Sequence, residues 1–402
     1  MLGGDALCMV MDAIPARGGP SGPLHLSLVT ETWAPEVNGV AMTLGRLVEG
    51  LRSRGHRVSL VRPRQAHEHA KSAPRDTHLC TGIPIPLYRA LRFGLAGAST
   101  LKRLWRGTRP DLVHVATEGP VGHAALGAAR ALGVPVSSSF HTNFHDYASR
   151  YGVGWIARPC EVVLRRFHNR TGITLVPSPT MKARLEARRF ERCEVLARGV
   201  DTQQFSPVRR DAALREAWGA GPRTKVLLCV GRLAKENNLD LAVRTFRYVQ
   251  RKHPSTRLVL VGAGPLEHRL VREPGVVLAG EFPVDEVGVA FASADLFLFP
   301  SLTETFGNVL CEAMATRLPT VSFDYAASAM HVRDGANGRK VPCGHEDAFM
   351  RAACDLLDDA GHASQLGKAA RASMQRTGWS GIVDQFEKVA TSLVGRYGGS
   401  SA

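Results

Sequence analysis

The stretch from Leu296 to Ala315, LFLFPSLTETFGNVLCEAMA, decides how the fold of this chain is interpreted. Its first four residues form an uninterrupted apolar run that ends at Pro300, which is the pattern of a buried strand. A polar loop follows, and Phe306-Gly307-Asn308 then opens a second apolar run that predicts a helix. In open α/β sheets, ligands bind where such strands end and such helices begin.

Two glutamates lie in this stretch, Glu304 in the loop and Glu312 inside the predicted helix. Backbone N–H groups at the start of the helix can hold an anion, and the two carboxylates can hold two sets of hydroxyls on the same ligand. Taken alone, the spacing fits an ordinary solvated helix equally well.

The complete string resembles the E-x7-E segment of retaining glycosyltransferases of the two-domain GT-B type, in the large family 4. The resemblance implies that Glu304 holds the donor sugar and that Glu312 holds the ribose of the nucleotide. It also places the residues between them against the donor, namely Phe306, Gly307, Asn308 and Val309.

The composition is that of a globular protein, since 44% of the 402 residues are hydrophobic and 22% are charged. Strand and helix patterns alternate in both halves, which predicts two parallel sheets with helices on both faces. The resemblance implies an α/β protein of GT-B fold, with two Rossmann-like domains facing across a cleft. We expect an acceptor-side domain at 24–200, a nucleotide-sugar-binding domain at 201–378, and a helix at 379–395 that crosses back to the first domain.

The beginning of the chain and its cysteines indicate the compartment. Residues 1–23 lack a basic start and a sustained apolar core, so we expect a disordered extension or an overlong start rather than a secretory signal. The eight cysteines form no C-x-x-C motif and no zinc-like spacing, which favours reduced thiols in a cytoplasmic protein without a metal centre. No run approaches the ~18 apolar residues that span a bilayer.

The positive charge is concentrated in one half. Residues 1–200 carry 27 Lys and Arg against 14 Asp and Glu, a net charge of +13, whereas residues 201–402 carry 24 against 22, a net charge of +2. Residues 147–170 also mix aromatic rings with arginines, which suits either a membrane interface or a core helix with a basic outer face. The basic charge suggests peripheral contact with the inner face of an anionic membrane. Nucleic-acid binding is not expected, since no motif supports it.

Two further positions in the N-terminal half are candidate ligand contacts. Gly39 stands between the loop after the first strand (24–30) and a helix at 40–54, where a phosphate can approach the backbone. PEVNGVAMTL resembles the first loop of the same family, which places Gly39, with Asn38 beside it, against the donor diphosphate. His141 follows a strand at 134–140; a lone His is more often structural, but the string FHTNFH resembles the family and implies a place near the donor sugar. Residues 63–82 are polar, and we expect them to form a surface loop.

The diphosphate needs a fixed cation, because negative charge develops on it as the bond to the sugar breaks. Arg232, after a strand at 225–230, is the candidate, since a guanidinium binds phosphate in bidentate fashion. The family usually reads G-R-L-x-x-E-K-N here, whereas this chain has Asn237 in the position of that Lys, and Lys235 is the nearest lysine. Either Lys235 substitutes or Asn237 acts as a neutral donor, and we favour Asn237. Gly262 and Gly264, after the next strand, are a weak nucleotide-binding signal.

The family resemblance implies a retaining hexosyltransferase, and it is strongest to GDP-mannose-dependent α-mannosyltransferases and sulfoquinovosyl-lipid synthases. We therefore expect mannosyl transfer from GDP-mannose to a lipid-linked or glycan acceptor, with His141, Arg232 and Glu304 as the catalytic residues. No metal or other cofactor is expected, since Arg232 and helix N-termini replace the cation. The alternatives are a UDP-sugar-dependent glycolipid synthase, a non-catalytic binding protein for sugar nucleotides, and a GT-B epimerase.

Overall fold

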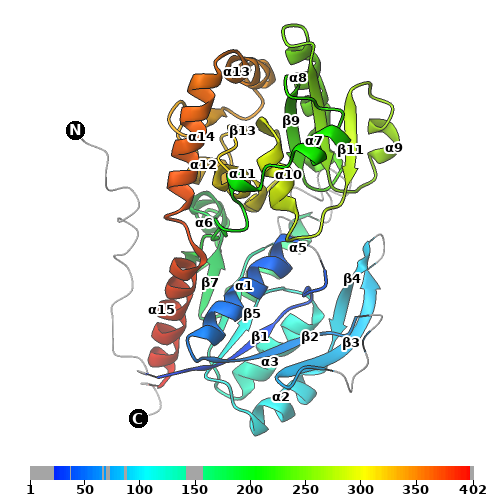
Figure 1. Ribbon diagram of the computed structural model, residues 1–402. Coiled ribbons are helices and arrows are strands. Elements are labelled where there is room, and N and C mark those ends of the chain that lie inside the picture. The colour runs from blue at the N-terminus through cyan, green and yellow to red at the C-terminus, as the bar shows by residue number, and fades with distance from the viewer. Residues whose placement is uncertain are drawn as a thin grey trace, which may run out of the picture.

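The computed structural model describes residues 22–36, 38–65, 68, 73–85, 88–141 and 157–398. Strands form two sheets, one of eight strands in the order β4-β3-β2-β1-β5-β6-β7-β8 and one of six in the order β11-β10-β9-β12-β13-β14. Figure 1 shows the first sheet below the second, with helices on both faces of each. The prediction of two α/β halves is confirmed, while the domain limits given above stay a prediction.

Seven strands of the first sheet run parallel to one another, and six of them lie at its centre and one end. They are β1 (His25–Val29), β2 (Arg57–Pro63), β5 (Leu112–Val115), β6 (Val136–Ser139), β7 (Ile173–Val176) and β8 (Cys193–Val195). The helices are α1 (Gly39–Ser53), α2 (Ala98–Gly107), α3 (Pro120–Ala131), α5 (Ala157–His168) and α6 (Pro179–Glu186). Every residue of β5, β6 and β7 is buried, because helices cover both faces of a parallel sheet.

The expectation of a surface loop at 63–82 was wrong for Pro63, which ends β2, and for the last six residues of the range. Strand β3 (Thr77–Ile85) pairs in parallel with β2 and antiparallel with β4 (Tyr88–Leu95), so residues 77–82 belong to the sheet. Gly82 and Gly94 lie opposite each other in this hairpin, and a Cβ at Gly82 would be 2.6 Å from the carbonyl oxygen of Arg64. These close approaches require glycine, and its lack of a side chain removes the alternating pattern by which a strand is predicted.

The second sheet contains β9 (Lys225–Val230), β10 (Thr256–Val261), β11 (Val276–Gly280), β12 (Leu296–Phe299), β13 (Thr320–Phe323) and β14 (Arg339–Val341). Its helices are α7 (Ala212–Ala217), α8 (Leu239–Gln250), α9 (Glu267–Leu270), α10 (Val287–Ser293), α11 (Asn308–Ala315), α12 (Ala327–His331), α13 (Glu346–Asp358) and α14 (Ala360–Met374), with short 3-10 turns η3 (Pro207–Arg209) and η4 (Lys235–Asn237). The strand order reverses between β9 and β12, which is where ligands bind in sheets of this kind. The loop with Arg232 follows β9, and the loop with Glu304 follows β12.

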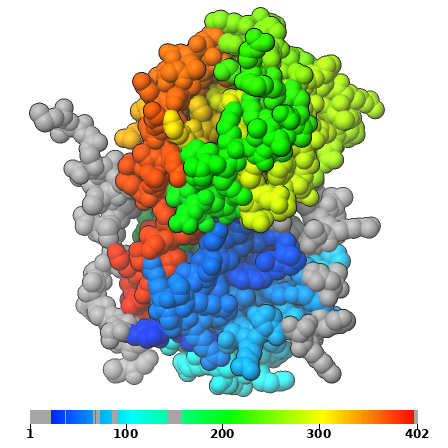
Figure 2. Space-filling view, in the orientation of Figure 1, coloured from blue at the N-terminus to red at the C-terminus, as the bar shows by residue number. Residues whose placement is uncertain are grey.

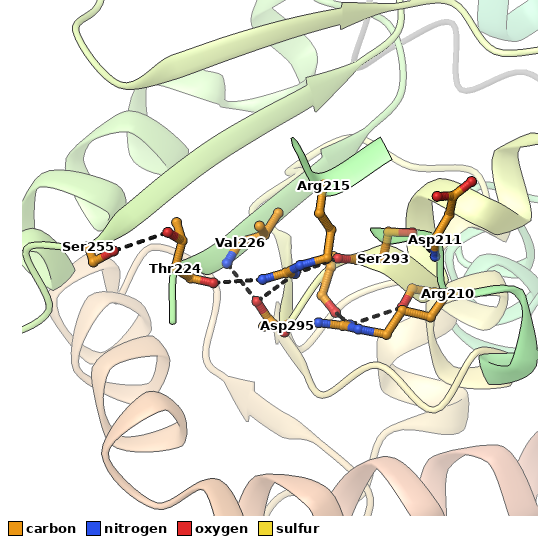
Figure 3. Close-up of polar contacts among 10 residues, drawn as sticks. Arg210, Asp211, Arg215, Thr224, Val226, Ser255, Ser293 and Asp295 are labelled. Atoms are coloured by element: carbon orange, nitrogen blue, oxygen red, sulfur yellow. Dashed lines mark hydrogen bonds and ion pairs between the residues drawn. The ribbon is translucent and has the colours of Figure 1, made fainter. Parts of the chain in front are cut away.

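A polar network fixes the start of β12 against β9 (Figure 3). The carboxylate of Asp295 accepts hydrogen bonds from the backbone N–H of Val226 at 2.8 Å and from Arg215 at 3.0 Å, and it pairs with Arg210 at 2.8 Å. Arg215 also donates to the carbonyl oxygens of Ser293 and Thr224, both at 2.7 Å. The segment 210–215 is thereby tied to the two strands that carry the loops of the candidate site.

The last helix, α15 (Trp379–Gly398), returns to the first sheet and lies beside α1 (Figure 1). Arg54 pairs with Asp384 at 2.7 Å, and the apolar face of α15 joins the core beneath α1. The backbone N–H of Val200 donates to the carbonyl oxygen of Thr377 at 3.0 Å, so the two chain connections between the halves lie side by side. The predicted crossing helix is therefore present. None of the described helices is both long and apolar enough to cross a membrane.

Candidate active site

A cleft of about 460 Å³ lies between the two halves, within the usual range for sites that bind small molecules. Its walls come from the start of α1, from the connection near residue 200, and from α11. Figure 2 shows the outer surface of this junction, where the blue N-terminal segment meets green and yellow segments of the second half. The residues that line the cleft include Arg46, Glu49, Phe306, Asn308 and Glu312.

The start of α1 forms one wall. The side-chain oxygen of Asn38 caps the helix by accepting from the N–H groups of Val40 at 3.1 Å and Ala41 at 2.9 Å. Asn38 is thus placed to order the loop. At Gly39, a Cβ would lie 3.5 Å from Asn308 Nδ2 and 3.6 Å from Arg198 Nη1, which are ordinary contacts. Packing within the protein would therefore allow a larger residue at position 39. Close approach of the donor stays the predicted reason why this residue is glycine.

The start of α11 forms the opposite wall. Gly307 precedes the helix with φ of 94°, and a Cβ there would lie 2.7 Å from Phe299 Cζ, so this turn requires glycine. No side chain of the described residues caps α11. The predicted contacts Asn308 and Val309 stand at this helix end, whose positive dipole favours an anion. Phe306, just before it, is buried.

Glu312 lies one turn further along α11, and it lines the cleft while only 8% exposed. Burial raises the pKa of its carboxyl group to about 7. Among the described residues, no hydrogen bond or cation opposes this shift. The carboxylate is therefore desolvated in the free protein and ready to accept hydrogen bonds from a ligand.

Glu304 is partly buried in the loop after β12, where Ser301 Oγ donates to its carboxylate at 3.0 Å. Burial raises the pKa of Glu304 to about 7, although the hydrogen bond from Ser301 and the charge of Arg198 lower it. The nearby carboxylate of Glu236 raises it further. Both glutamates predicted from the E-x7-E pattern thus have raised pKa values, as is common for ligand-binding carboxylates.

Arg232 follows β9, with its guanidinium 3.5 Å from the carboxylate of Glu236. The side-chain amide of Asn237 donates to the carbonyl oxygen of Arg232 at 2.6 Å, so it shapes the turn that carries this arginine. Lys235 is exposed in η4. Which of Lys235 and Asn237 serves the phosphate stays a prediction.

Gly262 and Gly264 lie in the loop after β10, against the Gly231–Leu233 turn. A Cβ at Gly262 would be 2.1 Å from the carbonyl oxygen of Gly231, and one at Gly264 would be 2.5 Å from that of Leu233. Packing against the turn therefore explains both glycines without a ligand. Their effect on the site is to let two loops approach closely and so position Arg232.

His141, at the end of the segment after β6, contacts an arginine that sequence reasoning did not include in the site. Arg198 Nη2 lies 3.2 Å from His141 Nδ1, and a guanidinium can only donate, so Nδ1 accepts and the neutral ring carries its proton on Nε2. Burial, with the charge of Arg198 added, lowers the pKa of His141 well below its ordinary value. Residues 142–156, including the rest of FHTNFH, lie outside the described residues.

Arg198 itself is 6% exposed and follows β8. Its Nη1 donates to the carbonyl oxygen of Gly39 at 3.1 Å, to Thr43 Oγ1 at 3.1 Å and to Asn308 Oδ1 at 3.4 Å. It therefore touches both walls of the cleft. The available sequence signal was a basic residue just beyond a strand, at the sheet edge where ligands bind.

One group of side chains in the described part of the chain has ligand atoms close enough to hold a metal ion: His253, Cys354 and Asp358. Lys252 Nζ lies 2.6 Å from the carboxylate of Asp358, where its positive charge opposes a second cation. None of these side chains lines the cleft. The prediction that no metal takes part in the reaction is left untested by this group.

Comparison with known proteins identifies the family. Residues 37–204 match the model of Glycosyltransferase Family 4, and residues 224–359 match that of Glycosyl transferases group 1. A GDP-mannose-dependent alpha-mannosyltransferase of Mycolicibacterium smegmatis is 30% identical over 93% of this chain and 98% of its own length. Sulfoquinovosyl transferase SQD2 of Arabidopsis thaliana is 30% identical over 74% of this chain and 59% of its own length.

A third relative, the GDP-mannose-dependent alpha-(1-6)-phosphatidylinositol monomannoside mannosyltransferase of M. smegmatis, is 29% identical over 86% of this chain and 92% of its own length. Among solved structures, HepE of Anabaena in complex with UDP and glucose superposes with a TM-score of 0.72 at 18% identity, covering 92% of this chain and all of HepE. That likeness shows the fold. The chain belongs to glycosyltransferase family 4, and it is a nucleotide-sugar-dependent hexosyltransferase with the GT-B fold.

Proposed function

We propose that the enzyme transfers a mannosyl group from GDP-mannose to a lipid-linked or glycan acceptor, with retention of configuration at the transferred carbon. The names of two similar enzymes support the donor, and one of them names a phosphatidylinositol mannoside as acceptor. The observation that carries a nucleotide-sugar site is Glu312, a desolvated carboxylate without a partner among the described residues, beside an uncapped helix start.

Each part of the donor has a place in this proposal. The diphosphate lies between Gly39 and the start of α11, where the helix dipole and Arg232 stabilise its charge. The ribose hydroxyls donate to Glu312 and the sugar hydroxyls to Glu304. His141, held neutral, faces the sugar. Burial removes water from both carboxylates and so raises their pKa values. A bound hydroxyl group can donate the hydrogen bond that water no longer supplies, which favours the ionised carboxylate.

The reaction needs no protein base in this scheme. The bond between the anomeric carbon and the phosphate oxygen breaks, and the acceptor oxygen bonds to that carbon on the same face. The acceptor proton passes to an oxygen of the departing diphosphate, whose negative charge has increased. Arg232 and the helix dipole then stabilise the nucleoside diphosphate product.

The acceptor is proposed to be reached at an anionic membrane, with the enzyme bound peripherally on the cytoplasmic face. The N-terminal half carries the +13 charge, and in its described part α5 exposes Val163, with 51% of its surface accessible, together with Arg158 and Arg166. Apolar and basic side chains on one helix suit the boundary between lipid headgroups and acyl chains.

A two-stage experiment tests the function. The midpoint temperature of thermal unfolding is measured first in the presence of GDP, UDP or ADP and then in the presence of the corresponding nucleotide sugars. A ligand that binds the native state raises this temperature. GDP and GDP-mannose should stabilise most, and GDP should be released from GDP-mannose faster with a mannosylated lipid acceptor than without it. Stronger stabilisation by UDP than by GDP would favour a UDP-sugar-dependent glycolipid synthase. Conversion of the donor without nucleotide release would indicate an epimerase. Donor binding without any turnover would indicate a non-catalytic binding protein.

A further inference from the structure

Arg198 is a buried cation whose hydrogen-bond partners among the described residues are all neutral. Its guanidinium donates to a backbone carbonyl, a hydroxyl, a side-chain amide oxygen and an imidazole nitrogen. Among the described residues, no carboxylate lies within ion-pair distance of it. Buried charges in proteins are ordinarily paired, so a guanidinium without a counter-charge indicates an anion that binds from outside.

The electrostatics of the free protein agree with this interpretation. Burial lowers the pKa of Arg198 to about 10, a value at which the group stays protonated in neutral solution. The acid that opposes this shift most is Glu304, which is itself difficult to ionise because burial raises its pKa to about 7. The positive charge of Arg198 is thus incompletely balanced by the described residues.

The position of Arg198 indicates which anion would bind. Its Nη1 contacts Gly39 at the start of α1 and Asn308 at the start of α11. Helix N-termini carry partial positive charge, and here one from each half of the molecule meets the same guanidinium. Three positive groups therefore converge behind the cleft wall, where Arg198 contacts the lining residues Thr43 and Asn308, and this arrangement suits a group with two adjacent negative charges.

We propose that Arg198 binds the diphosphate of the donor and supplies the second cation that family members obtain from a lysine at the position of Asn237. The inference rests on the proposed function. Asn237 is neutral, and its side-chain amide donates to the carbonyl oxygen of Arg232 at 2.6 Å, so it adds no positive charge. Arg198 acts from the first half of the molecule and Arg232 from the second, so the diphosphate also holds the two halves together.

The test compares ligands that differ in phosphate. Binding of GDP, guanosine and inorganic pyrophosphate is measured by calorimetry for the wild type, Arg198→Gln and Arg198→Lys. Arg46→Gln is the matched control, because Arg46 lines the cleft but already pairs with Asp201 at 3.1 Å and Glu49 at 3.6 Å. Thermal unfolding of each free protein reports any purely structural effect.

Arg198→Gln should weaken GDP and pyrophosphate roughly 10- to 100-fold, the range expected for a lost charge-assisted hydrogen bond, and leave guanosine unchanged. Arg198→Lys should recover part of that loss, and Arg46→Gln should bind GDP within about twofold of the wild type, as exposed pairs contribute little. Equal weakening of GDP and guanosine, or GDP affinity unchanged in Arg198→Gln, would overturn the inference. A wild type that binds no nucleoside diphosphate would instead refute the proposed function, and the inference with it.

Discussion

Replacing Glu312 by Gln should make the free enzyme more stable and a poorer nucleotide binder. Burial raises the pKa of Glu312 from 4.5 to about 7, which corresponds to a cost of about 3 kcal/mol for keeping the carboxylate ionised. Gln has the same shape without the charge, but its amide has a burial cost of its own. We therefore expect a net gain of about 1–2 kcal/mol in the free energy of unfolding at pH 8.

The pH dependence gives the sign of the effect. Below about pH 4.5 the carboxyl group is protonated in both the folded and the unfolded state, so the charge contributes nothing to the difference between the proteins. Between pH 4.5 and 7 the folded state binds more protons, and the destabilisation by Glu312 grows until it is complete above pH 7. The difference in melting temperature between Glu312→Gln and the wild type should therefore increase between pH 4.5 and 7.

Melting temperatures from pH 4.5 to 8.5 and GDP titrations of the same samples check both effects. The loss of charged contacts to the ribose should raise the dissociation constant for GDP by about 10- to 100-fold. Glu49→Gln is the control, because Glu49 lines the same cleft with 72% of its side chain exposed and should change neither quantity appreciably. A Glu312→Gln protein that is less stable at pH 8, or that binds GDP as tightly as the wild type, would refute the reasoning.

Four further outcomes are expected. Glu304→Gln should slow transfer in a steady-state assay with GDP affinity within about twofold of wild type; equal loss of GDP affinity in the Glu304 and Glu312 variants would contradict the separate roles. In donor turnover, Asn237→Ala should lower the rate and Lys235→Ala should change it little, and the reverse result would make Lys235 the phosphate ligand. Asp295→Asn should lower stability to urea by about 2–4 kcal/mol, since it leaves Arg215 buried without its anion; a midpoint equal to wild type would show that the network is dispensable. Co-sedimentation with vesicles should require anionic lipid and fade with salt, because exposed charges are screened within ~10 Å at 0.1 M; binding that ignores lipid charge would count against the membrane surface.

Burial on both faces explains which strands could be predicted from the sequence. Strands β9 and β12 begin and end where the sequence predicted them, because central parallel strands are buried on both faces and are rich in apolar side chains. The β3–β4 hairpin was missed, because it lies at the edge of its sheet and its pairing depends on Gly82 and Gly94 fitting against neighbouring loops and helices. Fit of that kind is a property of the folded protein and leaves no periodic signal.

Some residues of the candidate site could likewise be predicted from the sequence and others could not. Glu304 and Glu312 stand in one continuous string, so a local pattern could indicate them. Asn38 has the local signature of a helix cap, a residue type that favours this position, and it could have been identified as one. For Arg198 the local pattern indicates only a basic residue beyond a strand, because the contacts that define its role, Gly39 and Asn308, lie 159 and 110 residues away in the sequence.

The return of α15 to the first half has a consequence for synthesis on the ribosome. The apolar surface beneath α1 is completed by Val383, Phe386 and Leu393, which are among the last residues to be made. At about 5–20 residues per second, translation needs roughly 10–40 s to proceed from the end of the first half to the end of α15. During that interval the second half can fold while the first presents an uncovered apolar groove, which makes the nascent chain a natural client for a chaperone until its final helix emerges.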